Sequence, residues 1–413
     1  MALLRQLRHL LLALLAWPAW GADWPAATGS WADVSNAVRN ASDGDFVSIP
    51  AGSNVWNGRL KIDKAITVRG FSSNVVGGTI INLDPTGPDG PTDAIFLCLK
   101  AWTCISNMYL RGTDGATQKA WAVAVMTNNI LIRGVYFTHC LNPVAVGGFG
   151  LVSHCIFVNN ERMGRCHGMG NLNGNISFNS TKWPETFGLT NGFGSTSNFW
   201  ANTNFMVFED NFFFNDANFA PSGRSPQAVI TSQEGQMWIA RHNYIELSSW
   251  EMAPAFDTHG ALDTVTYGGF TVQVYSNIFK MNSGGLVQKL LDIRGGSGVC
   301  YSNWINTAFG GYVSLRDGDS PGFFFDNGPP ITNTWIWANF TNSGANWAFP
   351  VSDQPTTNVV NQTYFTNAPP TIYQMAYPDP LWTYFVPAAS GPADVTPGAI
   401  SPALPPVGAR RFF

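Results

Sequence analysis

The stretch VQVYSNIF at positions 272–279 contains the pattern that decides the fold: alternating apolar residues, then Asn277, then apolar residues again. Copies recur at 102–110, 205–213, 238–245, 299–305 and 335–341, with weaker copies at 130–137, 150–157 and 175–181. The anchor positions of these copies are Asn107, Val135, Cys155, Asn179, Asn211, Asn243, Asn277, Asn303 and Asn339. They are 20 to 36 residues apart, so the chain is an array of similar units.

Alternation on both sides of each anchor predicts short strands. We expect the Asn to form a sharp corner, because Asn tolerates the left-handed backbone conformation and can bond to its own kind in the next copy. Strands joined by corners at this spacing favour a right-handed parallel β-helix, in which each coil stacks on the next. A β-sandwich or a propeller is the alternative, but propeller blades would repeat more evenly.

The composition agrees with a β-rich protein. The chain has 413 residues, with 42 Gly, 29 Phe and 16 Trp beside only 22 Lys plus Arg. A hydrophobic fraction of 45% excludes disorder, and few charges with many Gly and aromatic residues suit strands and tight turns. A chain of this length can form a single elongated domain.

The N-terminal region carries a resemblance to a known family. Trp31, Val34, Val38 and Ala41 form one helical stripe, which predicts a short capping helix. GDFVSIPAGSNVW (44–56) and LKIDKAITVRG (60–70) follow. With the Asn-marked coils, these segments resemble the secreted right-handed parallel β-helix proteins of the pectate-lyase-like superfamily, over roughly residues 30–385. The resemblance implies the fold. The catalytic signatures of its pectate lyases and polygalacturonases are absent, apart from a faint echo of GHG in CHGMG at 166–170.

The ends of the chain predict its organisation and location. Arg5 and Arg8 before an apolar run indicate a signal peptide at 1–22, followed by the β-helix at 23–385 and a Pro-rich, disordered tail at 386–413. We therefore expect a secreted or periplasmic monomer with no membrane segment after signal removal. The mature chain has 20 basic and 26 acidic residues, near net −6, which argues against nucleic acid as the partner. Six cysteines without a CxxC pair make zinc unexpected and leave disulfide pairing open.

Charged residues gather in three segments that precede anchors: AFDTHG (255–260), LLDIRG (290–295) and YVSLRDG (312–318). Aligning them places Phe256, Leu291 and Val313 in the core. The opposite face then carries two predicted columns. One holds Thr231, Asp257, Asp292 and Ser314, and the other holds Gln233, His259, Arg294 and Arg316. Neighbouring coils lie about 4.8 Å apart, so these side chains would form a compact polar patch.

Such a patch suits an acidic polysaccharide as substrate. In β-elimination, cations neutralise the uronate carboxylate, a base removes the C5 proton and an acid protonates the leaving oxygen. Arg294 and Arg316 suit neutralisation, and His259 suits base or acid. Asp257 and Asp292 are candidates to orient the histidine or to bind calcium. Our candidate substrate-binding residues are Lys289, which is also a candidate base, Gln233, Arg241, Trp250, Glu251, Tyr275, Tyr301, Arg165 and His167.

Three other interpretations remain open. Asp257 and Asp292 are also the residue type for glycoside hydrolysis. The patch could instead be the footprint of a non-catalytic glycan-binding or adhesin-like β-helix, or simply cross-coil ion pairs on a solvated face. Two residues before each anchor, a second outward column runs through Arg133, Glu209, Arg241, Tyr275, Tyr301 and Trp337, and predicts a second groove.

Overall fold

The computed structural model describes residues 21–74, 76–84, 94–112, 121–140, 142–146, 149–160, 162–167, 205–215, 228–233, 237–248, 254–258, 271–282, 289–293, 297–306, 312–316, 334–341, 346–347, 351–354, 364–366 and 368. Residues 1–20 of the predicted signal peptide, the anchor Asn179 and the predicted tail lie outside the described residues. Among the described residues, no helix is long and apolar enough to cross a membrane.

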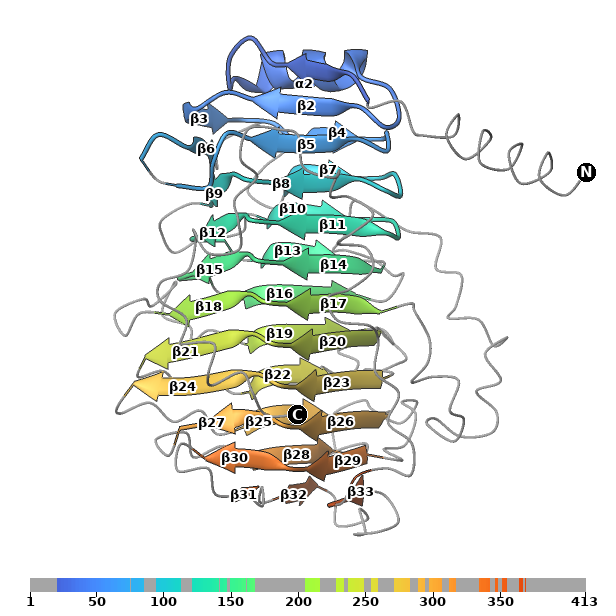
Figure 1. Ribbon diagram of the computed structural model, residues 1–413, viewed down its shortest axis with the longest axis vertical. Coiled ribbons are helices and arrows are strands. Elements are labelled where there is room, and N and C mark those ends of the chain that lie inside the picture. The colour runs from blue at the N-terminus through green and yellow to red at the C-terminus, as the bar shows by residue number, and fades with distance from the viewer. Residues whose placement is uncertain are drawn as a thin grey trace, which may run out of the picture.

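The chain forms a right-handed parallel β-helix, as the repeat predicts (Figure 1). Each coil adds one strand to each of three long sheets, called here A, B and C, and the strands stack along the long axis of the molecule. Every described pairing between coils is parallel, except that β31 (Asn346–Trp347) pairs antiparallel with β30 (Asn339–Thr341).

The strands of the three sheets have the following bounds. Sheet A contains β1 (Asp23–Pro25), β2 (Phe46–Ile49), β5 (Thr67–Gly70), β8 (Cys104–Ser106), β11 (Ile130–Arg133), β14 (Gly150–Ser153), β17 (Met206–Glu209), β20 (Met237–Arg241), β23 (Thr271–Tyr275), β26 (Ser297–Tyr301), β29 (Thr334–Trp337) and β33 (Tyr364–Phe365). Sheet B contains β3 (Gly52–Trp56), β6 (Thr79–Leu83), β9 (Tyr109–Arg111), β12 (Tyr136–Thr138), β15 (Ile156–Val158), β18 (Phe212–Asn215), β21 (Tyr244–Ser248), β24 (Ile278–Asn282), β27 (Trp304–Ile305), β30 and β31. Sheet C contains β4 (Leu60–Ile62), β7 (Ala94–Cys98), β10 (Trp121–Val125), β13 (Asn142–Val146), β16 (Arg162–His167), β19 (Ala228–Gln233), β22 (Pro254–Thr258), β25 (Lys289–Ile293), β28 (Tyr312–Arg316) and β32 (Val351–Gln354).

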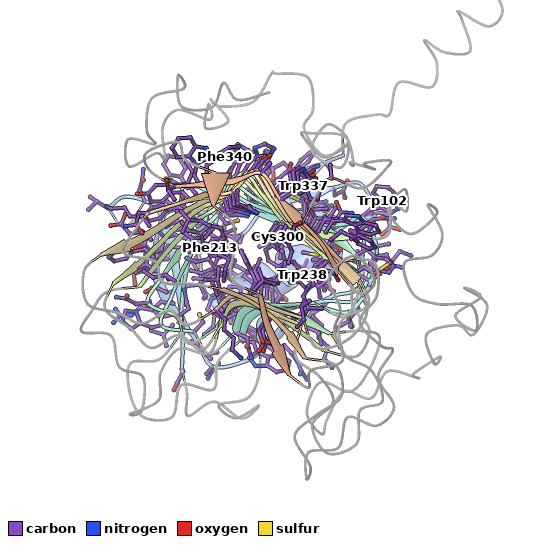
Figure 2. All side chains as sticks on the ribbon, turned by 90° about the horizontal axis from the view of Figure 1, so that it is seen from below. Trp102, Phe213, Trp238, Cys300, Trp337 and Phe340 are labelled. Atoms are coloured by element: carbon purple, nitrogen blue, oxygen red, sulfur yellow. The ribbon has the colours of Figure 1, made fainter. Side chains whose placement is uncertain are left out.

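The interior of the coils is filled by stacked apolar side chains. Figure 2, which looks along the long axis, shows Phe213, Trp238 and Cys300 inside the ring of sheets. Phe137, Phe157 and Phe213 stack in successive coils of sheet B, with ring centroids 4.9 and 4.7 Å apart. This axial stacking holds the coils together, because each ring covers the apolar face of the next.

The repeated Asn residues form a ladder at the corner between sheets A and B. The backbone N–H of Asn211 donates to Oδ1 of Asn243 (3.0 Å), and that of Asn243 donates to Oδ1 of Asn277 (3.1 Å). The same bond joins Asn277 to Asn303 and Asn303 to Asn339, at 3.1 Å each. All of these Asn are buried. The ladder therefore satisfies corner N–H groups that would otherwise be buried without partners.

The predicted left-handed conformation belongs to the residue before the Asn. Asp210, His242, Ser276, Ser302 and Ala338 have φ between +46° and +56°. Our assignment of the left-handed conformation to the Asn itself was therefore wrong, whereas the predicted bonding between Asn in successive copies is confirmed.

Asn107 was wrongly chosen as an anchor. It has φ +54° and occupies the left-handed position that Gly134 and His154 occupy in the next two coils. Met108 is its neighbour at the anchor position, since Tyr136 N–H donates to the Met108 carbonyl, just as Ile156 N–H donates to that of Val135.

Helix α2 (Trp31–Asn40) caps the first coil, as predicted. The Ser30 hydroxyl accepts a bond from the N–H of Asp33, and Val34, Ala37 and Val38 are buried. At the other end, Lys64 Nζ donates to the carbonyls of residues 38, 39 and 41 at 2.5–3.1 Å. Lys64 thus satisfies orphan carbonyls at the helix C-terminus.

Asn243→Ala should lower the free energy of unfolding by about 2–3 kcal/mol, because it leaves the buried N–H of Asn211 without its acceptor. Urea denaturation followed by tryptophan fluorescence measures the change. Asn36→Ala is the matched control, since Asn36 is exposed on α2. Equal effects of the two substitutions would show that the ladder contributes nothing specific.

The described cysteines should be unreactive in the native protein. Cys98, Cys104, Cys140, Cys155 and Cys300 are buried and carry thiols. Burial raises the pKa of Cys140, Cys155 and Cys300 to about 12. The thiolate is the reactive form, so iodoacetamide at pH 8 should leave the peptides with these cysteines unlabelled until the protein is denatured. Mass spectrometry reads the labels, and native labelling of Cys300 would contradict its inward placement.

Candidate functional site

The structure pairs the predicted site strands of sheet C in the expected register. Thr231 pairs with Asp257, Asp257 with Asp292, and Asp292 with Ser314. Phe256, Leu291 and Val313 belong to the core, so the aspartates face outward, as predicted. Two carboxylates therefore lie side by side on neighbouring strands, whose backbones are about 4.8 Å apart.

A β-bulge lies next to Lys289, whose side chain contacts one of these carboxylates, that of Asp292. In a regular strand, Lys289 would share the inward face of Leu291 and Ile293. The register between β25 and β28 shifts between Lys289 and Leu291, and Leu290 and Leu291 are both core residues. Lys289 Nζ consequently contacts Asp292 Oδ2 at 3.0 Å. Bulges of this kind re-aim side chains and are frequent next to active sites.

The outer face of sheet C changes character along the helix axis. In the column of Asp257, the N-terminal coils carry Leu97, Ala124 and Ala145, which belong to a separate apolar cluster. From β16 onward the same column carries Arg165, Thr231, Asp257, Asp292, Ser314 and Ser352. Polar residues therefore replace apolar residues at one point of an otherwise continuous sheet, and the candidate site occupies the C-terminal half.

The acidic pair is largely buried. Asp257 is 5% exposed, Asp292 is 0% and Lys289 is 6%. Like charges directly opposite each other on neighbouring strands are destabilising, and burial strengthens the repulsion. An adjacent pair of buried carboxylates is thus a candidate functional feature.

Some of the remaining predicted residues lie in described strands, and others lie outside the described residues. Arg165 pairs with Thr231 and His167 with Gln233, so these four are in the predicted columns of sheet C. Arg316 ends β28 and pairs with Gln354. His259 and Arg294 follow the last residues of β22 and β25 directly in sequence, and they lie outside the described residues, as do Trp250 and Glu251.

Arg241, Tyr275 and Tyr301 do not lie with Asp257. They belong to the outer face of sheet A, where the register pairs Glu209 with Arg241, Arg241 with Tyr275, and Tyr275 with Tyr301. This is the predicted second outward column, and four of its residues are buried: Glu209 and Arg241 are 0% exposed, Tyr275 is 4% and Tyr301 is 5%. Arg133 and Trp337 of the same column are partly buried.

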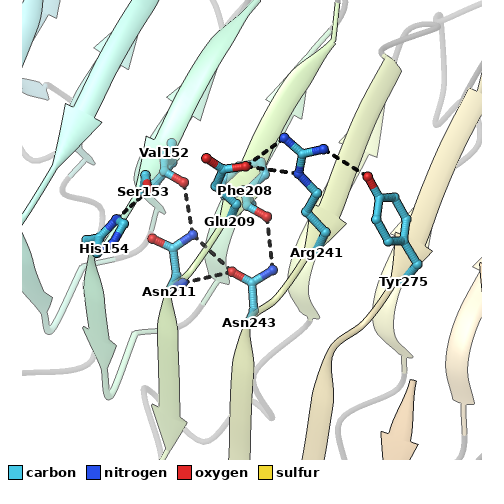
Figure 3. Close-up of polar contacts among 9 residues, drawn as sticks. All are labelled: Val152, Ser153, His154, Phe208, Glu209, Asn211, Arg241, Asn243 and Tyr275. Carbon is cyan, nitrogen blue, oxygen red and sulfur yellow. Dashed lines mark hydrogen bonds and ion pairs between the residues drawn. The ribbon is translucent and has the colours of Figure 1, made fainter. Parts of the chain in front are cut away.

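In this column of sheet A, Arg241 bonds to its neighbours Glu209 and Tyr275 (Figure 3). Nε and Nη2 of Arg241 donate to Glu209 Oε2 at 2.9 and 2.7 Å, and Nη1 donates to the Tyr275 hydroxyl at 3.0 Å. The rings of Tyr275, Tyr301 and Trp337 continue as a stack, with centroids 4.9 and 4.3 Å apart.

Electrostatics keep Arg241 charged despite its burial. Burial alone would lower the pKa of the guanidinium, but Tyr275 and Glu209 outweigh it by charge and hydrogen bonding, so the pKa of Arg241 is raised above its ordinary value. The ion pair and its hydrogen bonds satisfy the buried guanidinium, which is the arrangement of a structural network.

The described residues fit a bound calcium ion poorly. Calcium takes six to eight oxygen ligands, and Asp257, Asp292 and Ser314 supply only a few. The Lys289 ammonium already contacts Asp292, where a cation would be expected to bind. No group of three or more His, Cys, Asp or Glu side chains forms a metal cluster within the described part of the chain.

Comparison with known proteins adds the following. No protein-family model matches the sequence, and no curated protein is significantly similar to it. Among solved structures, an alginate lyase from Paenibacillus sp. str. FPU-7 is 10% identical, with 84% of this chain and 98% of that chain covered and a TM-score of 0.45. DFA-IIIase from Arthrobacter chlorophenolicus A6 is 11% identical, with 83% and 86% covered and a TM-score of 0.40. Similarities at this level carry no argument about activity.

The chain is therefore a parallel β-helix protein. Its polar candidate site lies on the outer face of sheet C, around Asp257, Lys289 and Asp292.

Arg241→Leu should lower the free energy of unfolding by about 3–5 kcal/mol, because Glu209 is then left as a buried carboxylate without its cation. The double variant Glu209→Leu/Arg241→Met should cost much less, since both charges are removed together. Lys280→Met is the control, because the Lys280–Glu246 pair is partly exposed and surface pairs contribute about 0–1 kcal/mol. Urea unfolding in which Arg241→Leu equals the control would disprove the structural role.

Proposed function

We propose that this protein is a secreted or periplasmic carbohydrate-active enzyme that cleaves an acidic, uronate-containing polysaccharide by β-elimination on the outer face of sheet C. The observation that carries the proposal is a cluster of three charged residues. Asp257 and Asp292 are paired in register, and Lys289 contacts Asp292 at a β-bulge. The two aspartates are brought together by the regular register of the sheet, whereas Lys289 meets Asp292 where a β-bulge interrupts that register.

The proposed reaction divides its tasks among charged groups of this face. Arg294 and Arg316 neutralise the substrate carboxylate, which makes the C5 proton more acidic. His259 removes that proton or protonates the leaving oxygen. Asp257 and Asp292 hold the cationic side chains in position, as Asp292 holds Lys289. Lys289 adds positive charge where the enolate-like transition state develops negative charge, or takes the role of base when its proton is removed.

In the proposed reaction, the side chains of the protein carry out these tasks without a metal ion. Calcium bound near Asp257 and Asp292 would neutralise the substrate carboxylate in the same way. Since the ammonium of Lys289 already contacts Asp292, the proposed steps rely on the cationic side chains.

A second candidate is glycoside hydrolysis, and one observation favours it. Retaining glycosidases hold two carboxyl groups about 5–5.5 Å apart. Neighbouring strands put the backbones of Asp257 and Asp292 about 4.8 Å apart, which is compatible with that separation. Lys289 would then favour Asp292 as the ionised nucleophile, and Asp257 would be the acid.

The deciding experiment follows the products on a panel of uronate polysaccharides. The mature protein is incubated with and without calcium, and absorbance at the unsaturated uronate band is recorded beside reducing ends. An absorbance rise identifies a lyase. Reducing ends without the absorbance identify a hydrolase, and binding without either identifies a glycan-binding protein and contradicts catalysis.

Lys289→Ala should lower kcat/KM on the cleaved polysaccharide by about 100-fold or more, because it removes a charge positioned for the transition state. Lys280→Ala is a closely matched control: its ammonium also contacts a carboxylate at 3.0 Å, but on sheet B. The control should change kcat/KM by less than about twofold. Folding of both variants is checked by urea denaturation. A fully active, folded Lys289→Ala variant would refute the proposed site.

A further inference from the structure

A cavity of about 470 Å³ lies between helix α2 and the coil that contains β4. Its lining includes Trp31, Arg39, Arg59, Lys61, Asp63 and Lys64. These residues are far in sequence from Asp257, and neither the fold nor the proposed reaction requires an open cavity here. We refer to it as the cap cavity.

The cap cavity concentrates positive charge in an acidic protein. Four of its lining residues are basic and one is acidic, whereas the whole chain has net charge −4. Clefts lined by one sign of charge attract ligands of the opposite sign. The chemistry of the lining therefore selects an anion.

One of the four cations has a structural task, and that task also favours anion binding. Lys64 Nζ donates to the carbonyls of Val38, Arg39 and Ala41 at the C-terminus of α2. That helix end carries partial negative charge, which would repel an anion. Lys64 neutralises it, so the cations Arg39 and Lys61, both exposed, present their charge to a ligand without this opposition.

The lining also offers an aromatic surface. Trp31 is half-buried, packs against the core and lines the cap cavity beside the basic residues. An indole ring presents an apolar surface and a cation presents a partner for a carboxylate. Together they match a sugar ring that carries an acidic group. A bare inorganic anion would use the cations but not the aromatic surface.

The cap cavity is separate from the candidate active site. Lys61 belongs to the same register column of sheet C as Asp257, but six strand spacings separate β4 from β22, roughly 29 Å. The buried apolar cluster with Leu97, Trp121 and Ala124 lies between them. One ligand unit cannot occupy both places.

We propose that the cap cavity is a non-catalytic binding site for an acidic saccharide, with Arg39 and Lys61 contacting its carboxylate and Trp31 contacting its ring. This site anchors the protein on an acidic glycan and does not depend on the reaction proposed for sheet C. Because its cations are exposed, binding should weaken as ionic strength rises.

Hydrogen exchange followed by mass spectrometry tests the proposal on the full mature chain. The probes are a uronate trisaccharide, a neutral glucose trisaccharide and inorganic sulfate. Lys289→Ala serves as the background so that no probe is consumed. The uronate trisaccharide should slow exchange in peptides spanning 31–41 and 59–64, and the neutral trisaccharide should not.

The variant Arg39→Ala/Lys61→Ala should require about tenfold more uronate trisaccharide for the same protection, since each surface charge contributes up to about 1 kcal/mol. Lys280→Ala, an exposed lysine far from the cavity, should leave it unchanged. Undiminished protection in the double variant would overturn the site, and equal protection by sulfate alone would overturn the saccharide as its ligand. If only the reaction on sheet C is wrong, the mature protein without substitutions forms no product from uronate polysaccharides, while protection at 31–64 persists.

Discussion

Stacking of successive coils in fixed register is the constraint on which the rest of this molecule depends. A one-residue slip in any coil would turn its core face outward. The Asn ladder opposes such slips, because the Oδ1 atom of each Asn accepts the backbone N–H of the equivalent Asn one coil earlier. A slip would break a buried hydrogen bond and bury an N–H without a partner. The ladder runs along one corner of the coils that contain Asn211 to Asn339, which are the coils that carry the candidate site.

That fixed register explains why the carboxylates of sheet C can be neighbours at all. On a flexible surface, Asp257 and Asp292 would move apart to reduce their repulsion. Here the backbone hydrogen bonds between β22 and β25 hold the two strands together, and the core residues Phe256 and Leu291 anchor them from beneath. The fold's rigidity opposes the repulsion, and Lys289 offsets part of it. Such preorganised charge is what a reaction with a charged transition state requires.

The sequence predicted the features that alternation and repetition determine. The strands, the capping helix and the pairing of Asp257 with Asp292 followed from apolar periodicity, because a residue's face in a regular strand depends only on its parity. Lys289 could not be placed beside Asp292 in this way, because a bulge interrupts the parity. The consecutive core residues Leu290 and Leu291 were the available signal. Burial was also unpredictable: Arg241 and Tyr275 face outward, as parity predicts, but are buried. Whether an outward residue is covered depends on segments distant in sequence.

The two outer faces with buried charge differ in how the strands bring the charged side chains together. On sheet A, Arg241 uses three nitrogens on Glu209 and Tyr275, and one acid faces one base. These contacts follow from the regular register of sheet A. On sheet C, Asp257 and Asp292 are neighbours in register, and Lys289 reaches Asp292 at a bulge in β25. Bulges of this kind re-aim side chains and are frequent next to active sites. This irregularity is the reason why the proposed site lies on the outer face of sheet C and not on that of sheet A.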